Sequence, residues 1–146
     1  FSLGAIIALI HDVIITVGIF SFLAYEVNLS IVAAVLTIVG YSMNDTVVIF
    51  DRVRENLKKY SKISIAEISD LSTNQTLSRT LITSVTTLLA LVSIFIFGGA
   101  ILKGFSFAMI VGVIIGTYSS IFVATPILNY TKVSQKTILK VDNENK

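Results

Sequence analysis

The chain alternates long apolar segments with short polar ones, and the apolar segments are longer than a soluble domain needs for its core. Four of them follow one another over residues 2–24, 29–50, 77–97 and 104–130. About 20 helical residues cross the hydrocarbon layer of a bilayer, whereas the strands of a membrane barrel are alternating segments of about ten residues. The pattern therefore predicts an all-α membrane protein with four transmembrane helices.

The polar segments predict how these helices are connected and oriented. Residues 51–76 form the expected loop between the second and third helices, and residues 131–146 form a polar tail. Lys and Arg tend to stay on the cytoplasmic side during insertion. Most of the 11 Lys and Arg side chains fall in these two segments, and Lys103 lies in the connection between the third and fourth helices. We therefore expect the loop and the C-terminus to be cytoplasmic.

Within the loop, Ser64 followed by Glu67 has the spacing of a capping box at a helix start. It predicts a short amphipathic helix at the membrane surface, which would act either as a basic anchor or as a surface that docks a partner.

Composition supports the membrane assignment and narrows the chemistry. Hydrophobic residues make up 54% and charged residues 14%, whereas soluble domains have about 25% charged residues. The chain has no cysteine and one histidine, so we expect no metal site and no cofactor. The net charge of +2 does not indicate nucleic acid, because topology explains the basic residues. The chain begins with Phe1 inside an apolar run, and we expect it to be part of a longer protein.

The stretch "GYSMNDTVVIFDR", residues 40–52, places Asp45 inside the second apolar segment. A charge at the centre of a membrane helix costs about 2.5–3.5 kcal/mol on insertion scales, and such residues usually have a partner or a function. At about 1.5 Å per residue, Asp45 and Arg79 lie roughly 24 Å and 27 Å from the outer ends of their helices. The two thus lie at similar depth on antiparallel helices, which makes Arg79 a candidate partner for Asp45. By the same rise, Asp12, beside His11, lies roughly 18 Å from the outer end of its helix. It would be either a second proton site or a fixed hydrogen-bond acceptor.

Small and polar side chains recur at intervals of three or four residues, which aligns them on helix faces. These stripes are Gly4, Ala8, Asp12 and Thr16 in the first segment, Thr37, Tyr41 and Asp45 with neighbouring Asn44 in the second, and Thr76, Arg79, Thr80, Thr83 and Thr87 in the third. The hydroxyl groups would either line a route for water and protons or join helices by hydrogen bonds of about 0.6 kcal/mol each. In the fourth segment, Gly112 and Gly116 form a GxxxG pattern that is typical of close helix packing.

Four motifs carry a family resemblance: "HDVIITVGIFSF", "GYSMNDTVVIFDRVREN", "TLSRTLITSVTTLL" and "GTYSSIFVATPI". In this order they resemble the membrane part of the SecF family, the partner of SecD in the bacterial SecDF protein-export accessory complex. The resemblance covers almost the whole chain. It implies a fold related to the resistance-nodulation-division transporters, in which this chain corresponds to helices three to six of six, without the first two helices and the large outer domain between them.

The resemblance also implies a function. Members of the family use the proton gradient across the cytoplasmic (inner) membrane to help exported proteins through the SecYEG channel, which is transport and not an enzymatic reaction. The implied coupling pair falls on Asp45 and Arg79, with the carboxylate gaining and losing a proton to switch conformations. The implied partners are SecD, SecYEG and unfolded preproteins in transit, with YajC as a further candidate.

Two other functional classes are compatible with parts of the pattern. A structural or assembly subunit without ion coupling would need Asp45 only as a cap or a fixed hydrogen-bond partner. An intramembrane aspartyl protease would need two facing carboxylates, and Asp12 with Asp45 would have to supply them although their estimated depths differ by about 6 Å. Neither the pattern nor the resemblance separates protons from sodium ions, since a carboxylate with hydroxyl groups serves either.

Overall fold

The structure is a computed structural model that describes residues 2–24, 28–60 and 63–130, apart from the side chain of Asn129. Its elements are α1 (Ser2–Phe22), α2 (Leu29–Lys59), α3 (Ile65–Phe97), α4 (Gly99–Ser119), the π-helical segment η1 (Ser120–Ala124) and α5 (Thr125–Tyr130). Four helical stretches, α1, α2, α3 and Gly99–Leu128, are long and apolar enough to cross a membrane. The prediction of an all-α fold with four such helices is confirmed for the described residues.

The segment 51–76, expected as a loop, is mostly helical. Helix α2 continues to Lys59 and α3 already begins at Ile65. The error has a simple cause, because falling hydropathy marks where a helix leaves the apolar layer and not where its hydrogen bonding stops. The charged and polar residues after position 50 include many good helix formers. The hydropathic spans 29–50 and 77–97 are therefore parts of longer helices.

The predicted capping box at the start of α3 is confirmed. The backbone N–H of Glu67 donates to the Ser64 hydroxyl at 3.3 Å, and the Ser64 N–H donates to the Glu67 carboxylate at 3.2 Å. The helix that begins here is, however, the 33-residue α3 and not a short surface helix.

A pair of glycines joins α3 to α4 in a very tight turn. The Gly98 N–H donates to the Ile94 carbonyl at 2.7 Å, and a Cβ at Gly98 would collide with that same carbonyl oxygen. Gly99 has a φ of 75°, a conformation that glycine adopts at little cost. Because the turn is so short, α4 begins at Gly99 and not near residue 104 as expected.

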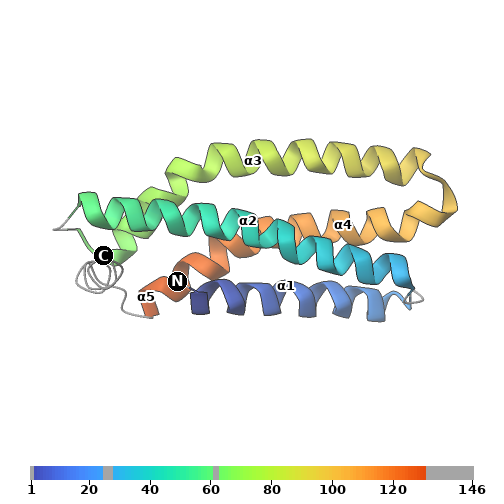
Figure 1. Ribbon diagram of the computed structural model, residues 1–146, viewed down its shortest axis with the longest axis horizontal. Coiled ribbons are helices and arrows are strands. Elements are labelled where there is room, and N and C mark those ends of the chain that lie inside the picture. Colours follow the sequence, from blue (N-terminus) through green and yellow to red (C-terminus); the bar gives the residue numbers. More distant parts are fainter. Residues whose placement is uncertain (1, 25–27, 61–62, 131–146) are drawn as a thin grey trace, which may run out of the picture.

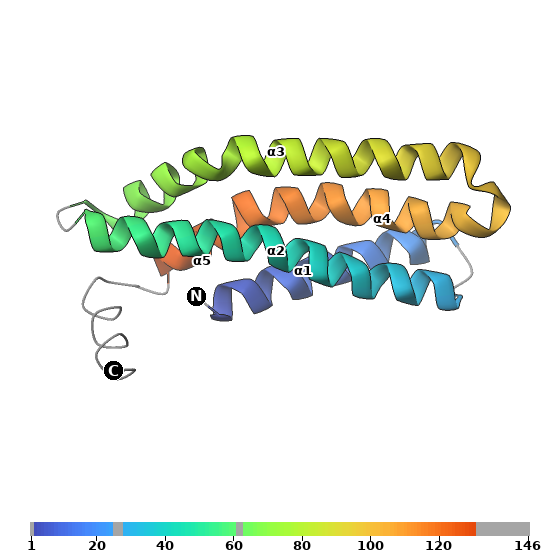
Figure 2. The ribbon, with the colours of Figure 1, turned by 45° about the horizontal axis from the view of Figure 1, so that its top comes forward.

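The four long helices lie alongside one another, with α1 and α3 on opposite sides and α2 and α4 between them (Figures 1 and 2). Helix α4 packs against each of the other three. Since α2 and α4 both run away from the Gly98–Gly99 turn, they are parallel to each other and antiparallel to α1 and α3 (Figure 1). We call the end with the Gly98–Gly99 turn the α3–α4 end, and the opposite one the α2–α3 end.

The buried interior is divided into three layers. One hydrophobic cluster, which includes Ile49, Val53 and Ile68, fills the α2–α3 end, and another, which includes Ile31, Ile38 and Val113, fills the α3–α4 end. Between them, all four long helices and η1 contribute buried polar side chains. This polar layer consists of Asp12, Thr16, Ser42, Asp45, Thr46, Thr80, Ser84, Ser119 and Ser120. Buried polar groups cost free energy unless they are paired, so the layer is the natural place to look for a functional site.

Candidate functional site

Asp12 is a well-satisfied carboxylate in the polar layer. Its side chain is 1% exposed. The Ser42 hydroxyl of α2 donates to Asp12 Oδ2, and His11 Nδ1 lies 3.1 Å from Asp12 Oδ1. The buried stripe of Gly4, Ala8, Asp12 and Thr16 brings α1 close to its neighbours, as its residue pattern predicts. Asp12 thus acts as a hydrogen-bond acceptor that joins α1 to α2, with His11 as a local partner.

Asp45 has a different environment, although it lies in the same layer. Only 5% of the residue is exposed, and its Oδ2 atom has no hydrogen-bond partner. More than nine in ten buried polar groups in proteins have a partner, and a carboxylate is among the costliest groups to leave without one. Among the described residues, no group of three His, Cys, Asp or Glu side chains could hold a metal ion here or elsewhere.

A chain of hydroxyl groups connects three helices beside Asp45. The Tyr41 hydroxyl donates to Ser84 Oγ at 3.4 Å, and Ser84 Oγ lies 2.7 Å from Thr117 Oγ1 of α4. Tyr41 is one helical turn before Asp45 on α2, and Thr80 is one turn from Ser84 on α3 in the same direction along the bundle. Thr80 is buried at this level. The hydroxyl chain therefore lies about one helical turn from Asp45, towards the α3–α4 end.

Arg79 lies next to this level, on α3. It is exposed and lines a hollow of about 250 Å³ between α2 and α3, together with Val48, Asp51, Arg52, Glu55, Gln75 and Thr76. Among the described residues, no ion pair within 4.0 Å joins Asp45 to Arg79. The two predicted coupling residues are thus close in level, as expected from their depths, but they are not bonded to each other in this conformation.

Polar side chains also hold α2 and α3 together beside this hollow, towards the α2–α3 end. The buried Asn56 Nδ2 donates to Ser72 Oγ at 2.8 Å and to Gln75 Oε1 at 3.0 Å. Arg52 Nε donates to the same Gln75 oxygen at 2.7 Å. These bonds fix the helical segments beyond the apolar span, which the sequence analysis had treated as a loop.

The structure does not place all predicted polar residues on the inner faces. Thr37 and Asn44 are exposed, and Thr83 and Thr87 are only half-buried. The inner face of α2 instead presents Ser42 and Thr46 beside Asp45, and α4 contributes Ser119 and Ser120. Ser42 and Thr46 each lie one residue after a member of the expected α2 stripe, Tyr41 and Asp45, so that stripe does not include them. Spacing could have located Ser42, which is three residues before Asp45 on the same helix face.

Gly112 and Gly116 lie where α4 meets α2. A Cβ at Gly112 would run into the Ile38 side chain, and one at Gly116 would come within 3.2 Å of Ser42 Cβ. The two parallel helices therefore approach closely along this line, with Gly112 opposite Ile38 and Gly116 opposite Ser42.

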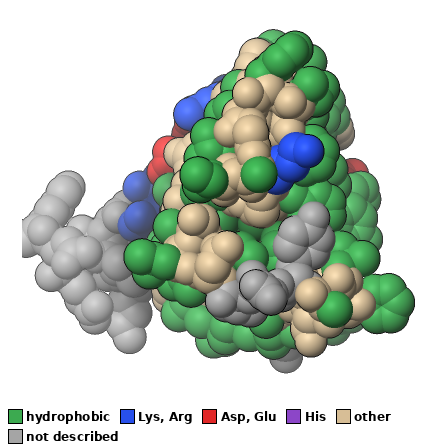
Figure 3. Space-filling view, turned by 90° about the vertical axis from the view of Figure 1, so that its right-hand side faces the viewer, with side chains coloured by type: hydrophobic (Ala, Val, Ile, Leu, Met, Phe, Trp, Pro, Cys, Tyr) green, Lys and Arg blue, Asp and Glu red, His purple; other side chains and the backbone are tan. Residues whose placement is uncertain are grey.

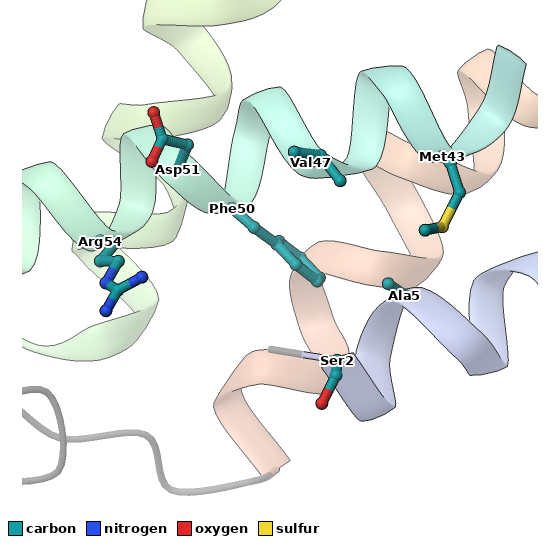
Figure 4. A pocket seen from close by; sticks show the side chains of 7 residues that line it. All are labelled: Ser2, Ala5, Met43, Val47, Phe50, Asp51 and Arg54. Atoms are coloured by element: carbon teal, nitrogen blue, oxygen red, sulfur yellow. The ribbon is translucent and has the colours of Figure 1, made fainter. Parts of the chain in front are cut away.

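A second hollow, of about 330 Å³, lies between the start of α1 and α2 and is separate from Asp45. Figure 4 shows Met43, Val47 and Phe50 along one side, Ser2 and Ala5 of α1 on the other, and Asp51 and Arg54 at one end. Its walls are apolar apart from Ser2 and the residues at that end. The Phe50 ring fills the space over Gly4, where a Cβ would lie 3.1 Å from Phe50 Cζ.

The fold and the polar layer define a helical membrane bundle with a buried carboxylate at mid-length of one helix, one oxygen of which has no hydrogen-bond partner. Residues 1–134 match the family model described as "Protein export membrane protein SecD/SecF, C-terminal". The chain therefore belongs to the SecD/SecF family of protein-export membrane proteins.

Named relatives and solved structures agree with this assignment. The chain is 59% identical over 134 residues to the protein translocase subunit SecF of Rhodothermus marinus, covering 88% of the chain and 44% of that relative. It is also 59% identical over 122 residues to SecF of Vibrio alginolyticus, covering 84% and 39%. The crystal structure of SecDF from Thermus thermophilus, a translocon-associated membrane protein, superposes with a TM-score of 0.87 at 45% identity, over 90% of this chain and 18% of that one.

A SecDF structure in the super-membrane-facing form gives a TM-score of 0.85 at 42% identity, over 98% of this chain and 19% of that one. The fold is thus a four-helix part of a resistance-nodulation-division-type bundle. The chain spans less than half the length of the curated relatives it matches.

Proposed function

We propose that this chain is the ion-coupling membrane part of a SecF subunit, in a complex that uses the proton-motive force to assist protein export through the Sec channel. The observation that carries the proposal is Asp45, a buried carboxylate with one oxygen lacking a partner. An unsatisfied ionised group at this depth is costly, whereas a group that gains and loses a proton has two states of different stability. Such a difference can bias a conformational equilibrium.

Arg79 provides the second half of the proposed switch. It lies in the hollow between α2 and α3, in reach of several polar side chains and without a bond to Asp45. The absence of an Asp45–Arg79 ion pair fits a state in which the carboxyl group is protonated and neutral. Ionisation of Asp45 would attract the guanidinium and change the packing of α2 against α3.

The partners and the orientation are part of the same proposal. The complex contains SecD, acts with the SecYEG translocon on unfolded preproteins, and lies in the bacterial cytoplasmic membrane, with YajC as a further candidate partner. The α2–α3 end is assigned to the cytoplasm because Arg52, Arg54, Lys58 and Lys59 lie on the last turns of α2. The α3–α4 end, seen in Figure 3, presents mainly hydrophobic and uncharged groups around a hollow that includes Lys103.

The test is gradient-dependent export into inverted membrane vesicles that contain the complete protein with its SecD partner. Asp45→Asn keeps the shape of the side chain but cannot ionise, so we expect the stimulation of export by the gradient to be lost while the protein still inserts. Asp70→Asn is the matched control, because Asp70 is an exposed acid on α3, and it should leave export unchanged.

The alternative, a structural or assembly subunit without ion coupling, makes the opposite prediction. Export by Asp45→Asn vesicles equal to wild type, at equal expression, would mean that Asp45 has a structural role, and the coupling mechanism would have to be abandoned.

A further inference from the structure

Ser119 is the buried hydroxyl of α4 that the fold does not explain. In membrane helices a serine or threonine hydroxyl commonly bonds to the carbonyl four residues earlier. Ser120 does so with Gly116 at 2.7 Å and Thr117 with Val113 at 2.8 Å. Ser119 is fully buried, yet its Oγ has no hydrogen-bond partner. Among the described residues, the side-chain atoms in this condition are Asp45 Oδ2, Ser69 Oγ and Ser119 Oγ.

The register between α2 and α4 puts two of these atoms at the same level. The helices are parallel, and Gly112 lies against Ile38 while Gly116 lies against Ser42. Each pair is separated by 74 positions, because 112 − 38 and 116 − 42 both equal 74. The same offset puts residue 45 + 74 = 119 opposite Asp45. Parallel helices keep this offset over one further turn, so Ser119 and Asp45 lie at one height in the polar layer.

Helical geometry also turns the two side chains towards each other. At about 100° per residue, Ser119, seven residues after Gly112, lies roughly 20° from the direction of Gly112, which faces α2. Asp45 is three residues after Ser42, which faces α4, and four after Tyr41, which faces α3. Its direction therefore falls between these two, on the side of α2 that α4 covers.

We infer that Ser119 is a positioning residue of the coupling site, whose Oγ–H donates to the ionised carboxylate of Asp45 directly or through one water molecule. In the present conformation Ser119 Oγ and Asp45 Oδ2 both lack a partner, which corresponds to the state in which this hydrogen bond is not formed. The inference rests on the proposed role of Asp45 as the residue that gains and loses a proton.

The titratable and charged groups that face Asp45 are few. From α1 the facing titratable groups are Asp12 and His11, which are bonded to each other, and Ser42 is engaged with Asp12. From α3 the nearest charge is Arg79, which lines the hollow beside this level. Helix α4 has one charged residue, Lys103, and that residue lies at the α3–α4 end. Ser119 is thus the buried donor on α4 that is free to serve Asp45.

The backbone after Ser119 is suited to a change of this kind. Segment η1 begins at Ser120, and the Thr125 hydroxyl donates to the Ser120 carbonyl five residues earlier at 3.2 Å. Short π-helical segments are often found at functional sites, where they add one residue to a helical turn. A return of this turn to α-helical geometry would rotate α4 locally, beside the serine that has to reach the carboxylate.

The test measures the protonation of Asp45 itself, in the complete protein with its SecD partner in native membranes. Dicyclohexylcarbodiimide modifies protonated carboxyl groups in apolar surroundings, and peptide mass spectrometry reads the modified fraction at Asp45 across a pH series. Loss of a donor to the carboxylate favours the protonated form, so the half-maximal pH should rise by about one unit in Ser119→Ala and Ser119→Cys. Cysteine leaves no cavity at this position and its thiol is only a weak donor, so that a shift in both variants reports the lost hydroxyl and not a cavity.

Ser69→Ala is the matched control, since Ser69 Oγ is the other buried unpartnered hydroxyl and lies on α3 towards the α2–α3 end. It should leave the half-maximal pH at the wild-type value. An unchanged value in both Ser119 variants, or an equal rise in Ser69→Ala, would overturn the inference. The outcome is separable from the export assay: a shift in the Ser119 variants with export indifferent to Asp45→Asn supports the hydrogen bond and rejects the coupling role. Loss of export in Asp45→Asn with no shift in the Ser119 variants supports the coupling role and rejects the hydrogen bond.

Discussion

Asp12 and Asp45 are the same residue type in the same polar layer, but their neighbours give them different properties. Asp12 accepts from Ser42 across a helix interface and has His11 beside it. Asp45 has a buried oxygen without any partner. A satisfied carboxylate resists a change of protonation state because its donors would lose their acceptor, whereas an unsatisfied one has no such bond to break. At the residue scale this contrast favours Asp45 for switching and Asp12 for structure.

The structural role of Asp12 can be tested through its donor. Ser42→Ala removes the cross-helix bond and leaves a buried carboxylate oxygen unpartnered, so we expect the free energy of unfolding to fall by about 1–2 kcal/mol. Equilibrium unfolding in mixed detergent micelles measures the change. Thr37→Ala is the control on the same helix, since its exposed hydroxyl bonds only to the Ala33 carbonyl of its own helix. Equal effects of the two substitutions would contradict this assignment.

At the scale of elements, the close approach of α2 and α4 sets the geometry of the polar layer. The glycines of α4 let Ile38 and Ser42 of α2 sit against its backbone. Any increase in the separation of these helices would move Ser42 and Asp45 relative to the serines of α4. Helix packing and the site are therefore the same structural feature, viewed at two scales.

The close packing of α2 against α4 predicts that one added methyl group has a strong effect on the free energy of unfolding. Gly112→Ala drives a Cβ into Ile38, and overpacking of this kind costs about 1–3 kcal/mol in the free energy of unfolding. Gly104→Ala on the same helix meets nothing within 4 Å, so it should be neutral or slightly stabilising. Unfolding in detergent compares the two variants. A Gly112→Ala protein as stable as Gly104→Ala would show that α4 and α2 are not in firm contact.

Local signals in the sequence were sufficient to predict four apolar helices and the Ser64 cap. Each depends on a few neighbouring residues and on one physical rule. The inner faces were harder, because one residue along a helix is a rotation of about 100°. Asn44 and Asp45 illustrate this, since the first is exposed and the second is buried. Which side of a membrane helix faces protein depends on its neighbours, and the sequence contains no direct measure of that.

Ser119 and η1 could not have been predicted for a related reason. The importance of Ser119 comes from the register between α2 and α4, which depends on how Gly112 and Gly116 pack. The π-helical turn has no residue signature of its own in "SIFVA". Tertiary contacts decide both features, and local propensity does not.

At the scale of the whole molecule, the proposed orientation puts the α2–α3 end in the cytoplasm. The chain has no cysteine, so a single introduced cysteine is the one thiol in this region that a labelling reagent can modify. Lys59→Cys at the end of α2 should react with a membrane-impermeant maleimide in inverted vesicles, and Ala100→Cys beside the α3–α4 turn should not. Right-side-out vesicles should give the reverse. The opposite labelling pattern would require the bundle to be inverted, with Asp45 nearer the outer face.

The unexpected length of α2 and α3 has a mechanical consequence. Helix α2 continues for 14 residues from Asp45 to Lys59, about 21 Å at the rise of an α-helix, and α3 runs beside it. Asn56 and Arg52 of this part of α2 are hydrogen-bonded to Ser72 and Gln75 of α3, so the two helical segments form one rigid unit. A tilt of this unit by about 10° at the level of Asp45 would displace the end of α2 by roughly 4 Å. In the proposed coupling cycle, a small displacement at Asp45 would therefore become a larger one at the end of α2, where it would be available to a partner protein.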